Sequence, residues 1–395
     1  MSEHDVELKP SKPAMWNDPK FRALFFQALL VVALGYFVYT IVHNTLSNME
    51  ARGISTGFAF LSEPAGFGIL QSLISFDESN TYGRTFLVGL LNTLLVSGLG
   101  IFFATILGFI MGVARLSHNW VIAKLAAVYI EMFRNIPLLL QIFFWYFAVL
   151  GALPGVRQSM SLGAGVEFNN RGLYLPAPVP EDGFAIVGWM FLIGIIGSIF
   201  VYRWARKRQD ETGQQFPVFW TSLGLIIGLP LIIFLVSGSP LSWDMPELKG
   251  FNFKGGLTII PELLALLLAL TIYTGTFIAE TVRAGINAVS HGQTEAALAL
   301  GFTRGQTMRL IIIPQAMRVI IPPLTSQYLN LAKNSSLATA VGYPDIVAVF
   351  MGTTLNQTGQ AVEITMMTMG VYLTISLSIS VFMNWFNKRM ALVER

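Results

Sequence analysis

The stretch that organises this chain reads EAALALG at residues 295–301 and continues to IIIP at residues 311–314. Two pairs around it have the spacing of a capping box, Ser290 with Gln293 and Thr303 with Gln306. Gly301 stands where a left-handed residue ends a helix, and the charge of Glu295 suits a first helical turn. We therefore expect two short helices with a glycine turn between them. A surface helix-turn-helix without a partner would show the same features.

The composition of the whole chain predicts a membrane protein. Of its 395 residues, 54% are hydrophobic and only 12% are charged, whereas soluble domains carry roughly 25% charged residues. About 20 apolar residues are needed to cross a bilayer as a helix. We count eight candidate crossings, at about residues 22–43, 86–113, 122–151, 185–203, 217–237, 258–288, 322–352 and 363–387. The predicted fold class is all-α, a polytopic transmembrane bundle of about eight helices.

The distribution of basic residues predicts how these crossings are oriented, because cytoplasmic loops are enriched in Lys and Arg. The N-terminal tail contains Glu3, Asp5 and Glu7, unlike a cleaved signal peptide, so we interpret the first crossing as a retained anchor. With the N-terminus inside, seventeen Lys and Arg lie on the cytoplasmic side and six on the other. Both termini, and the loop that contains Glu295, are therefore expected in the cytoplasm.

The stretch at 295–314 also resembles the signature of the membrane subunits of bacterial ABC importers. That signature is EAA, three residues, Gly, nine residues, and then IxLP. The matching positions are Glu295, Ala296, Ala297, Gly301, Ile311 and Pro314. Ile313 stands where the family usually has Leu, which is a conservative change. The resemblance implies that this loop holds the coupling helix, which docks in a groove of a separate ATP-hydrolysing subunit.

Other segments resemble the amino-acid permeases of this class, of the polar or general L-amino-acid type in the histidine–glutamine permease family. They are GLLNT at 89–93, a pattern of polar residues between 129 and 141, and KNSSL at 333–337. Importers of this class commonly have about five core crossings. The resemblance therefore implies a type I permease core, to which an N-terminal helix and a hairpin at 185–237 have been added.

This interpretation divides the chain into six parts. We expect a cytoplasmic tail at 1–21, an extra helix with an outer interfacial segment at 22–83, the first part of the core at 84–151, an outer loop, inserted hairpin and second outer loop at 152–255, the second part of the core at 256–390 with the coupling loop at 289–321, and a tail at 391–395.

Charged and small residues inside the crossings predict local contacts. Two pairs are three residues apart on one helix face and are candidate ion pairs, Glu131 with Arg134 and Glu280 with Arg283. About 30 residues of helix, roughly 45 Å, are too long for one level crossing, so we expect a break at Pro137. Gly108 and Gly112 have the spacing of closely packed membrane helices, although incidental glycines in a glycine-rich chain would look the same.

The crossing at 322–352 is the most polar. A lysine at the centre of a membrane helix costs at least about 2.5 kcal/mol unless it is paired or wet, so Lys333 must face a partner, a cavity or the interface. The substrate-pathway candidates are Asn330, Lys333, Asn334, Ser335, Ser336 and Thr276. Two alternatives remain open for Lys333, a structural salt bridge and a helix that begins later. For Thr276 the alternative is a hydroxyl that bonds the preceding turn.

The sequence argues against several kinds of chemistry. It has no cysteine and four scattered histidines, so we predict no metal site. No HExxH motif and no paired catalytic carboxylates stand out, so we predict no catalytic residue. No phosphate-binding loop is present, so we do not expect this chain to be the ATPase by that route, and we expect no cofactor in it. The resemblance implies that ATP and Mg bind to a partner ATPase. Basic residues are not interleaved with aromatics, so nucleic acid is not an expected partner.

The resemblance implies a permease subunit of an ATP-driven amino-acid importer in the bacterial inner membrane. Its expected partners are a cytosolic ABC ATPase dimer, an extracytoplasmic amino-acid-binding protein, the lipid bilayer, the amino-acid substrate and a second permease subunit. We expect a heterodimer and leave a homodimer open. Two other classes remain as alternatives at this point. One is an ion-gradient-driven secondary transporter, although no inverted repeat is visible. The other is a non-transporting membrane scaffold.

Overall fold

The computed structural model describes residues 16, 18–51, 53 and 56–390. In this part of the chain, seven helices are long and apolar enough to cross a membrane, and a bent pair of helices brings the number to eight. The expectation of a polytopic bundle of about eight helices is therefore confirmed. Residues 1–15 and 17 of the predicted tail at 1–21, and the whole predicted tail at 391–395, lie outside the described residues.

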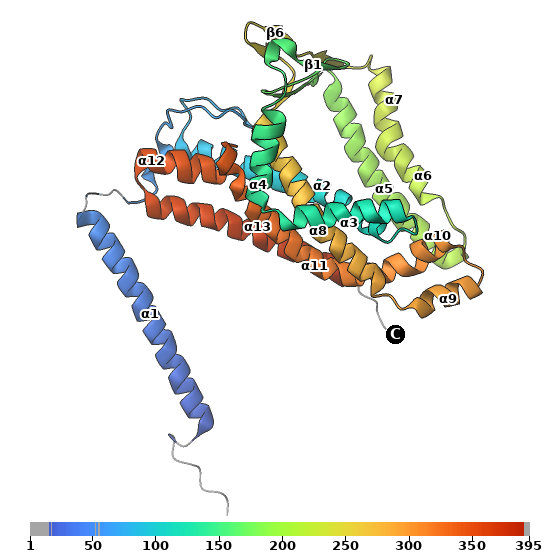
Figure 1. Cartoon of the computed structure of the whole chain (residues 1–395), viewed down its shortest axis with the longest axis horizontal. Helices are drawn as coiled ribbons and strands as arrows, with labels where there is room; N and C mark the ends of the chain where they lie inside the picture. The colour runs from blue at the N-terminus through green and yellow to red at the C-terminus, as the bar shows by residue number, and fades with distance from the viewer. Residues whose placement is uncertain (1–15, 17, 52, 54–55, 391–395) are drawn as a thin grey trace, which may run out of the picture.

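Helix α1 (Pro19–Ala51) stands apart from the other helices, as Figure 1 shows. Its apolar window is 0% buried inside the chain, and Met49 is its one buried residue among those described. The segment that follows was expected either to form a helix along the outer interface or to be a loose loop. Its described part contains one short 3-10 turn, Ala59–Ser62, within an otherwise irregular loop.

The centre of the bundle is a parallel pair of helices, α2 (Tyr82–Arg115) and α8 (Pro261–Asn287). Two glycines of α2 set their close approach. A Cβ on Gly108 would lie 2.5 Å from Ile278, and one on Gly112 would lie 2.7 Å from the Ala279 carbonyl oxygen. Side chains larger than hydrogen do not fit there, so these glycines are packing positions of the kind their spacing suggested.

Helix α11 (Ile313–Asn334) packs antiparallel to α8, with Ile320 against Gly285 near one end. It is preceded without a break by α10 (Arg304–Thr307) and a π-helical segment, Met308–Ile312, and is followed by a 3-10 segment, Ser335–Val341. The span therefore runs over Arg304–Val341. Two prolines, Pro322 and Pro323, lie inside it.

The expected single crossing at 322–352 is corrected by this geometry. The helix begins some eighteen residues earlier than the expected start, at Arg304, and ends at Val341. Gly342, with φ of 79°, then turns the chain. A second helical segment follows, Val347–Thr354 and α12 (Leu355–Thr358), before the last membrane helix, α13 (Ala361–Met390).

Two apolar clusters fill the interior. The larger lies where α2, α8, α11 and α4 (Leu138–Phe143) meet, and Leu266, Leu270, Ile321 and Leu331 are completely buried in it. The smaller joins the segment after Gly342 to α13 and to the loop before α2, around Phe350. Burial of such side chains contributes roughly 1.5–3 kcal/mol each relative to exposure to water.

The expected break at Pro137 is present. Helix α3 (Trp120–Asn135) starts at Asn119, whose side chain accepts a hydrogen bond from the Val121 N–H at 2.9 Å. It ends just before Pro137, and the chain continues as α4 and a π-helical segment, Phe144–Leu150, at an angle of 106° to α3. Ile136 is extended, as the residue before a proline prefers.

Short strands form a cap at one end of the bundle, a feature that the sequence interpretation did not predict. A four-stranded antiparallel sheet has the order β1-β2-β3-β8. Two further antiparallel pairs are β4 with β5 and β6 with β7. The strands are β1 (Met160–Gly163), β2 (Val166–Asn169), β3 (Gly172–Leu175), β4 (Ala177–Pro180), β5 (Leu241–Asp244), β6 (Glu247–Lys249), β7 (Asn252–Lys254) and β8 (Leu257–Ile259).

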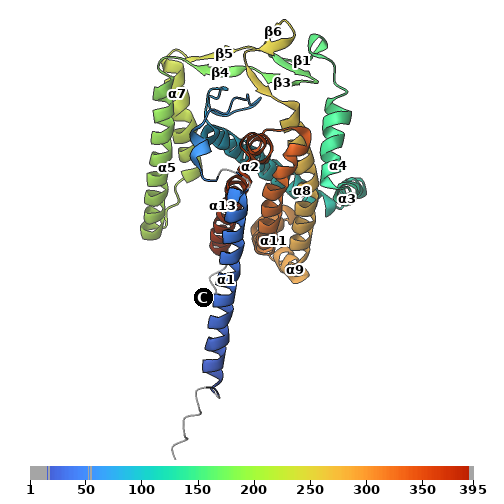
Figure 2. The same cartoon turned by 90° about the vertical axis from the view of Figure 1, so that its left-hand side faces the viewer.

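The cap and the predicted coupling loop lie at opposite ends of α8. β8 ends just before α8 begins, and α9 (His291–Ala299) starts four residues after α8 ends. At 1.5 Å per residue, α8 separates them by about 40 Å. Figures 1 and 2 both show the strands at one end and α9 at the other. We call these the cap end and the loop end.

The inserted hairpin consists of α5 (Phe184–Thr212) and a second helix in three parts: α6 (Val218–Leu223), a π-helical segment Gly224–Gly228, and α7 (Leu229–Val236). Its two arms pack on each other where Gly194 meets the backbone of Leu225. The paired strands β4 and β5 join the hairpin to the cap. Figure 2 shows it at the edge of the bundle.

Candidate functional site

The loop that matches the importer signature is a well-capped structure. The Ser290 hydroxyl accepts a hydrogen bond from the Gly292 N–H at 3.3 Å and caps the start of α9. At its end Gly301 has φ of 83°. The Gly301 N–H donates to the Leu298 carbonyl and the Phe302 N–H to the Ala297 carbonyl, which is the Schellman pattern. The glycine turn predicted from sequence is present.

Of the two capping boxes expected, one forms. Thr303 and Gln306 satisfy each other's backbone N–H groups at the start of α10. Gln293 does not bond back to Ser290. Its side-chain oxygen instead accepts a hydrogen bond from Gln315 at 3.2 Å, and so links α9 to the first turns of α11. Glu295 is the fifth residue of α9 rather than a first-turn residue, which corrects the expected interaction with the helix N-terminus.

α9 presents one face outward. Ala297 is 2% exposed and faces the rest of the chain, whereas Glu295, Ala296 and Ala299 are exposed. Leu300, directly after the helix, is 78% exposed. Together with Ala296 and Ala299, it forms the uncovered apolar part of this face. Ala297 is a packing residue and not part of that face.

The second helix of the loop is not short. It runs from Arg304 into α11 without a break, so the two signature residues Ile311 and Pro314 belong to the entry of a membrane span. Ile311 is half-buried, and Pro314 is exposed two residues after the π-helical segment Met308–Ile312 ends.

The six pathway candidates separate into outward and inward groups. Asn330 and Lys333 are exposed on α11, and the described part of the chain places no carboxylate at ion-pair distance from Lys333. Asn334 and Ser336 are half-buried, and the Ser336 hydroxyl donates to the Lys333 carbonyl at 2.8 Å. These residues form a polar outer face on α11.

The inward group consists of Ser335 and Thr276, both 0% exposed. Ser335 donates to the Ala332 carbonyl at 2.8 Å and accepts from the Ser97 hydroxyl at 3.3 Å. Thr276 donates to the Tyr273 carbonyl at 2.7 Å. A hydroxyl that bonds the preceding turn is satisfied within its own helix, so Thr276 lies away from the polar face of α11.

Sequence reasoning missed a polar turn that follows α11. The Asn92 side chain donates to the Pro344 carbonyl at 2.9 Å, and the Thr93 hydroxyl accepts from the Ile346 N–H at 3.0 Å. Asp345 is 0% exposed. Its carboxylate accepts hydrogen bonds from the Ala348 N–H at 2.8 Å and the Tyr372 hydroxyl at 3.3 Å. A lone Asp in an apolar segment was the available signal.

A cluster of charged residues lies between α2, α3 and α8. Arg283 donates two hydrogen bonds to Glu280, one of them at 3.0 Å. The expected pair of Glu131 with Arg134 is absent from the ion pairs of the described residues. Glu131, Arg134, Glu280, Arg283 and Arg115 instead line one cavity of about 350 Å³. Tertiary packing, and not spacing along α3, therefore sets the surroundings of Glu131.

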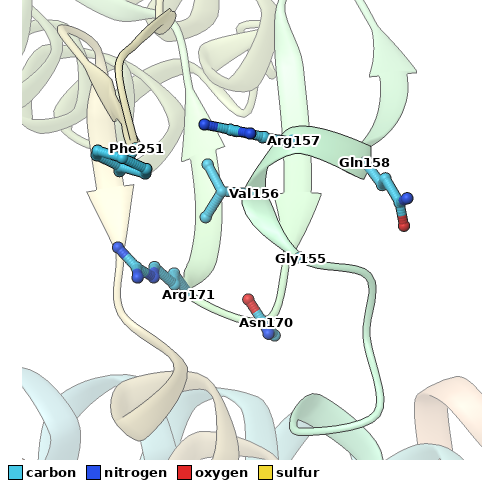
Figure 3. Close-up of a pocket in the computed structure, with 7 residues that line it drawn as sticks. All are labelled: Gly155, Val156, Arg157, Gln158, Asn170, Arg171 and Phe251. Atoms are coloured by element: carbon cyan, nitrogen blue, oxygen red, sulfur yellow. The ribbon is translucent and has the colours of Figure 1, made fainter.

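The cap carries a basic surface hollow of about 330 Å³, drawn in Figure 3. The Arg157 guanidinium lies 5.3 Å from the centre of the Phe251 ring, which is cation–π distance. Arg171 lies on the other side of the hollow. No group of three or more potential metal-ligating side chains occurs among the described residues.

A helical bundle with this loop has the organisation of the membrane subunit of a type I ABC importer. The family described as "binding-protein-dependent transport system inner membrane component" matches residues 211–392. The putative amino-acid ABC transporter permease protein YhdX of Escherichia coli K12 is 56% identical over 378 residues, which is 96% of each chain.

Two further relatives agree with this result. The general L-amino acid transport system permease protein AapQ of Rhizobium johnstonii is 52% identical over 100% of both chains. The glutamate/glutamine/aspartate/asparagine transport system permease protein BztB of Rhodobacter capsulatus is 42% identical over 96% of both. The chain belongs to the permease family of amino-acid ABC transporters. It is a multi-pass inner-membrane subunit of an ATP-driven importer and not the enzyme that hydrolyses ATP. The two alternatives that the sequence left open, a secondary transporter and a non-transporting scaffold, are therefore set aside.

Proposed function

We propose that this permease is driven through the outward face of α9, which docks on a cytosolic ABC ATPase. The supporting observation is the geometry of the loop. Ala296 and Ala299 leave room for a partner, Leu300 is 78% exposed, and both ends of the loop are fixed by capping bonds. A rigid element with an exposed apolar contact can transmit a displacement from one protein to another.

The same geometry suggests how movement reaches the membrane. The Gln315–Gln293 bond ties α9 to the start of α11, and α11 continues to the polar residues Asn330 and Lys333. When ATP and Mg close the ATPase dimer, displacement of α9 shifts the loop end of α11. The bundle then exchanges inward-open and outward-open states around that polar face.

The translocation pathway follows the polar outer face of α11 in this proposal. Lys333 is exposed and unpaired within the described residues, which is costly against lipid and favourable beside a polar path or a partner. Asn330, Asn334 and Ser336 share that region. One permease supplies half of the pathway, so a second permease chain, different from this one, completes it.

The orientation follows from the charge distribution and from the docking proposal together. The loop end and both termini lie in the cytoplasm, and the cap end receives the amino-acid-binding protein outside. The division of the chain into an added helix, a two-part core and an inserted segment is part of the same proposal. The names of AapQ and BztB support a broad range of polar and general L-amino acids as substrates.

The docking proposal is tested by placing a charge on the outward face. We expect Ala299→Arg and Leu300→Arg to lower ATP hydrolysis stimulated by the binding protein at least tenfold in proteoliposomes, because burying an unpaired charge costs several kcal/mol. Gln215→Arg is the matched control, since Gln215 is exposed in the hairpin turn at the same end. Normal stimulation in both α9 variants would contradict docking.

A further inference from the structure

The cap end contains a second cavity besides the hollow drawn in Figure 3, and the function proposed above gives it no role. Its volume is about 650 Å³, within the range of small-molecule sites. Its walls come from the loop before α2, the helix after Pro137, the start of α8 and the cap strands. The lining residues are Leu70, Gln71, Ser72, Tyr146, Asn170, Arg171, Tyr174, Asn252, Thr258, Ile260, Pro261 and Glu262.

The lining contains one cationic and one anionic side chain, Arg171 and Glu262. They form no ion pair with each other or with other described residues. Arg171 uses one guanidinium nitrogen to donate to the Asn252 side chain at 3.2 Å. The fork geometry of a guanidinium matches a carboxylate, and the remaining N–H groups of Arg171 can donate hydrogen bonds to a carboxylate.

The anionic group in the lining is Glu262. One Glu262 oxygen accepts from the Tyr146 hydroxyl at 2.9 Å, which orients the carboxylate. Glu262 also lies in the first turn of α8, where the helix dipole favours a negative charge. The side-chain oxygen of Gln71 is buried and has no hydrogen-bond partner among the described residues. This oxygen is closed off from the cavity, so Glu262 supplies the anionic group at this part of the lining.

Arg171 therefore offers a site for a carboxylate, and Glu262 offers a site for an ammonium group, in the lining of one cavity. We propose that this cavity is an entry site for the α-carboxylate and α-ammonium groups of a free L-amino acid at the cap end of the permease. The remaining walls, from Leu70, Thr258 and Ile260, would meet side chains of different sizes. The proposal deepens the importer function and rests on it.

The lining of this cavity joins the cap to the core helices. Arg171, Tyr174 and Asn252 belong to the cap, whose strands flank the inserted hairpin, whereas Tyr146 and Glu262 belong to core helices. Burial raises the pKa of the Tyr174 phenol while the positive charge of Arg171 opposes that rise. The positive charge of Arg171 therefore acts on Tyr174 in the cavity wall.

The test is equilibrium binding to the purified complex of permeases and ATPase, without ATP and without binding protein. The probe is an equimolar mixture of the twenty ¹⁴C-labelled L-amino acids. We expect saturable binding to the wild-type complex and a loss of affinity of about tenfold or more in Arg171→Gln and in Glu262→Gln, the effect of removing a charged hydrogen-bond partner. Arg157→Gln is the control, because Arg157 lies in the same cap but lines the other hollow.

Competition distinguishes contact with the ligand from a structural role. Amino-acid amides lack the carboxylate, and N-acetyl amino acids lack the ammonium group. Relative to the parent amino acids, amides should compete better in Arg171→Gln than in wild type, and N-acetyl derivatives should compete better in Glu262→Gln. A variant that is merely misfolded would lose affinity without this crossed pattern.

Three results would overturn the proposal. They are no saturable binding to the wild-type complex, unchanged affinity in both variants, and a uniform loss without the crossed pattern. The assay uses neither ATP nor the docking face of α9. A wrong docking proposal therefore leaves its outcome unchanged, and the two proposals fail separately.

Discussion

A graded series at Gly301 separates the backbone role of this residue from docking. Gly301 has φ of 83°, and a Cβ built there meets no atom within 4 Å. The cost of Gly301→Ala is therefore conformational, about 1–2 kcal/mol for an L-residue in the left-handed region. That free energy changes a conformational equilibrium by a factor of roughly 5–30. Gly301→Asn should cost less, because Asn adopts this conformation more readily.

Gly301→Asp has nearly the shape of Asn but adds a charge next to Leu300. We expect near-normal stimulated ATP hydrolysis in Gly301→Asn, a partial loss in Gly301→Ala, and abolished uptake and stimulation in Gly301→Asp while membrane insertion survives. The assay is ATP hydrolysis and uptake in proteoliposomes that contain the complete importer and its binding protein. Gel filtration in detergent checks that each variant assembles.

The order of the variants is the decisive result. If Asn and Asp lower stimulation equally, backbone strain explains the effect and the docking face is not involved. If the reconstituted Asp variant is stimulated normally, the loop does not couple the permease to the ATPase.

Two other positions give sharp expectations. Gly108→Ala should lower stability by about 1–3 kcal/mol through overpacking, because its Cβ would lie 2.5 Å from Ile278, whereas Gly98→Ala in the same helix meets nothing within 4 Å and should not. Thermal unfolding in detergent compares them, and equal unfolding temperatures would contradict the packing argument. Lys333→Ala should change the uptake affinity or the amino-acid profile, while Lys333→Arg keeps the charge and most of the activity. Uptake kinetics for several amino acids that match wild type in Lys333→Ala would remove Lys333 from the pathway.

The features that the sequence predicted well depend on local chemistry. Gly301 ends α9 because a left-handed residue is needed there, and the Thr303 box forms because both partners lie within one turn. Pro137 interrupts a helix through its own ring, whatever surrounds it. The helical membrane bundle follows from hydropathy, which is also a property of each segment alone.

The features that it missed depend on packing between distant segments. The start of the span that contains α11 was placed too late. Arg304, Arg309 and Arg318 lower the mean hydropathy of its first part, so this part was not recognised as belonging to a membrane helix. The cap strands have at most four residues each, too few for an alternating pattern to be recognised. Asp345 is buried because residues of α2 close over its turn, and neither segment shows this by itself.

The paired prolines of α11 decide where that long helix can flex. Pro322 and Pro323 supply no backbone N–H, so the carbonyl groups of Arg318 and Val319 lose their partners four residues later. About seven residues of helix lie between Gln315, which bonds to α9, and this weak point, and about ten lie between it and Lys333. If α9 couples the permease to an ATPase as proposed, we expect a displacement from the loop end to change the angle of α11 at these prolines and to tilt the part of the helix that carries Lys333.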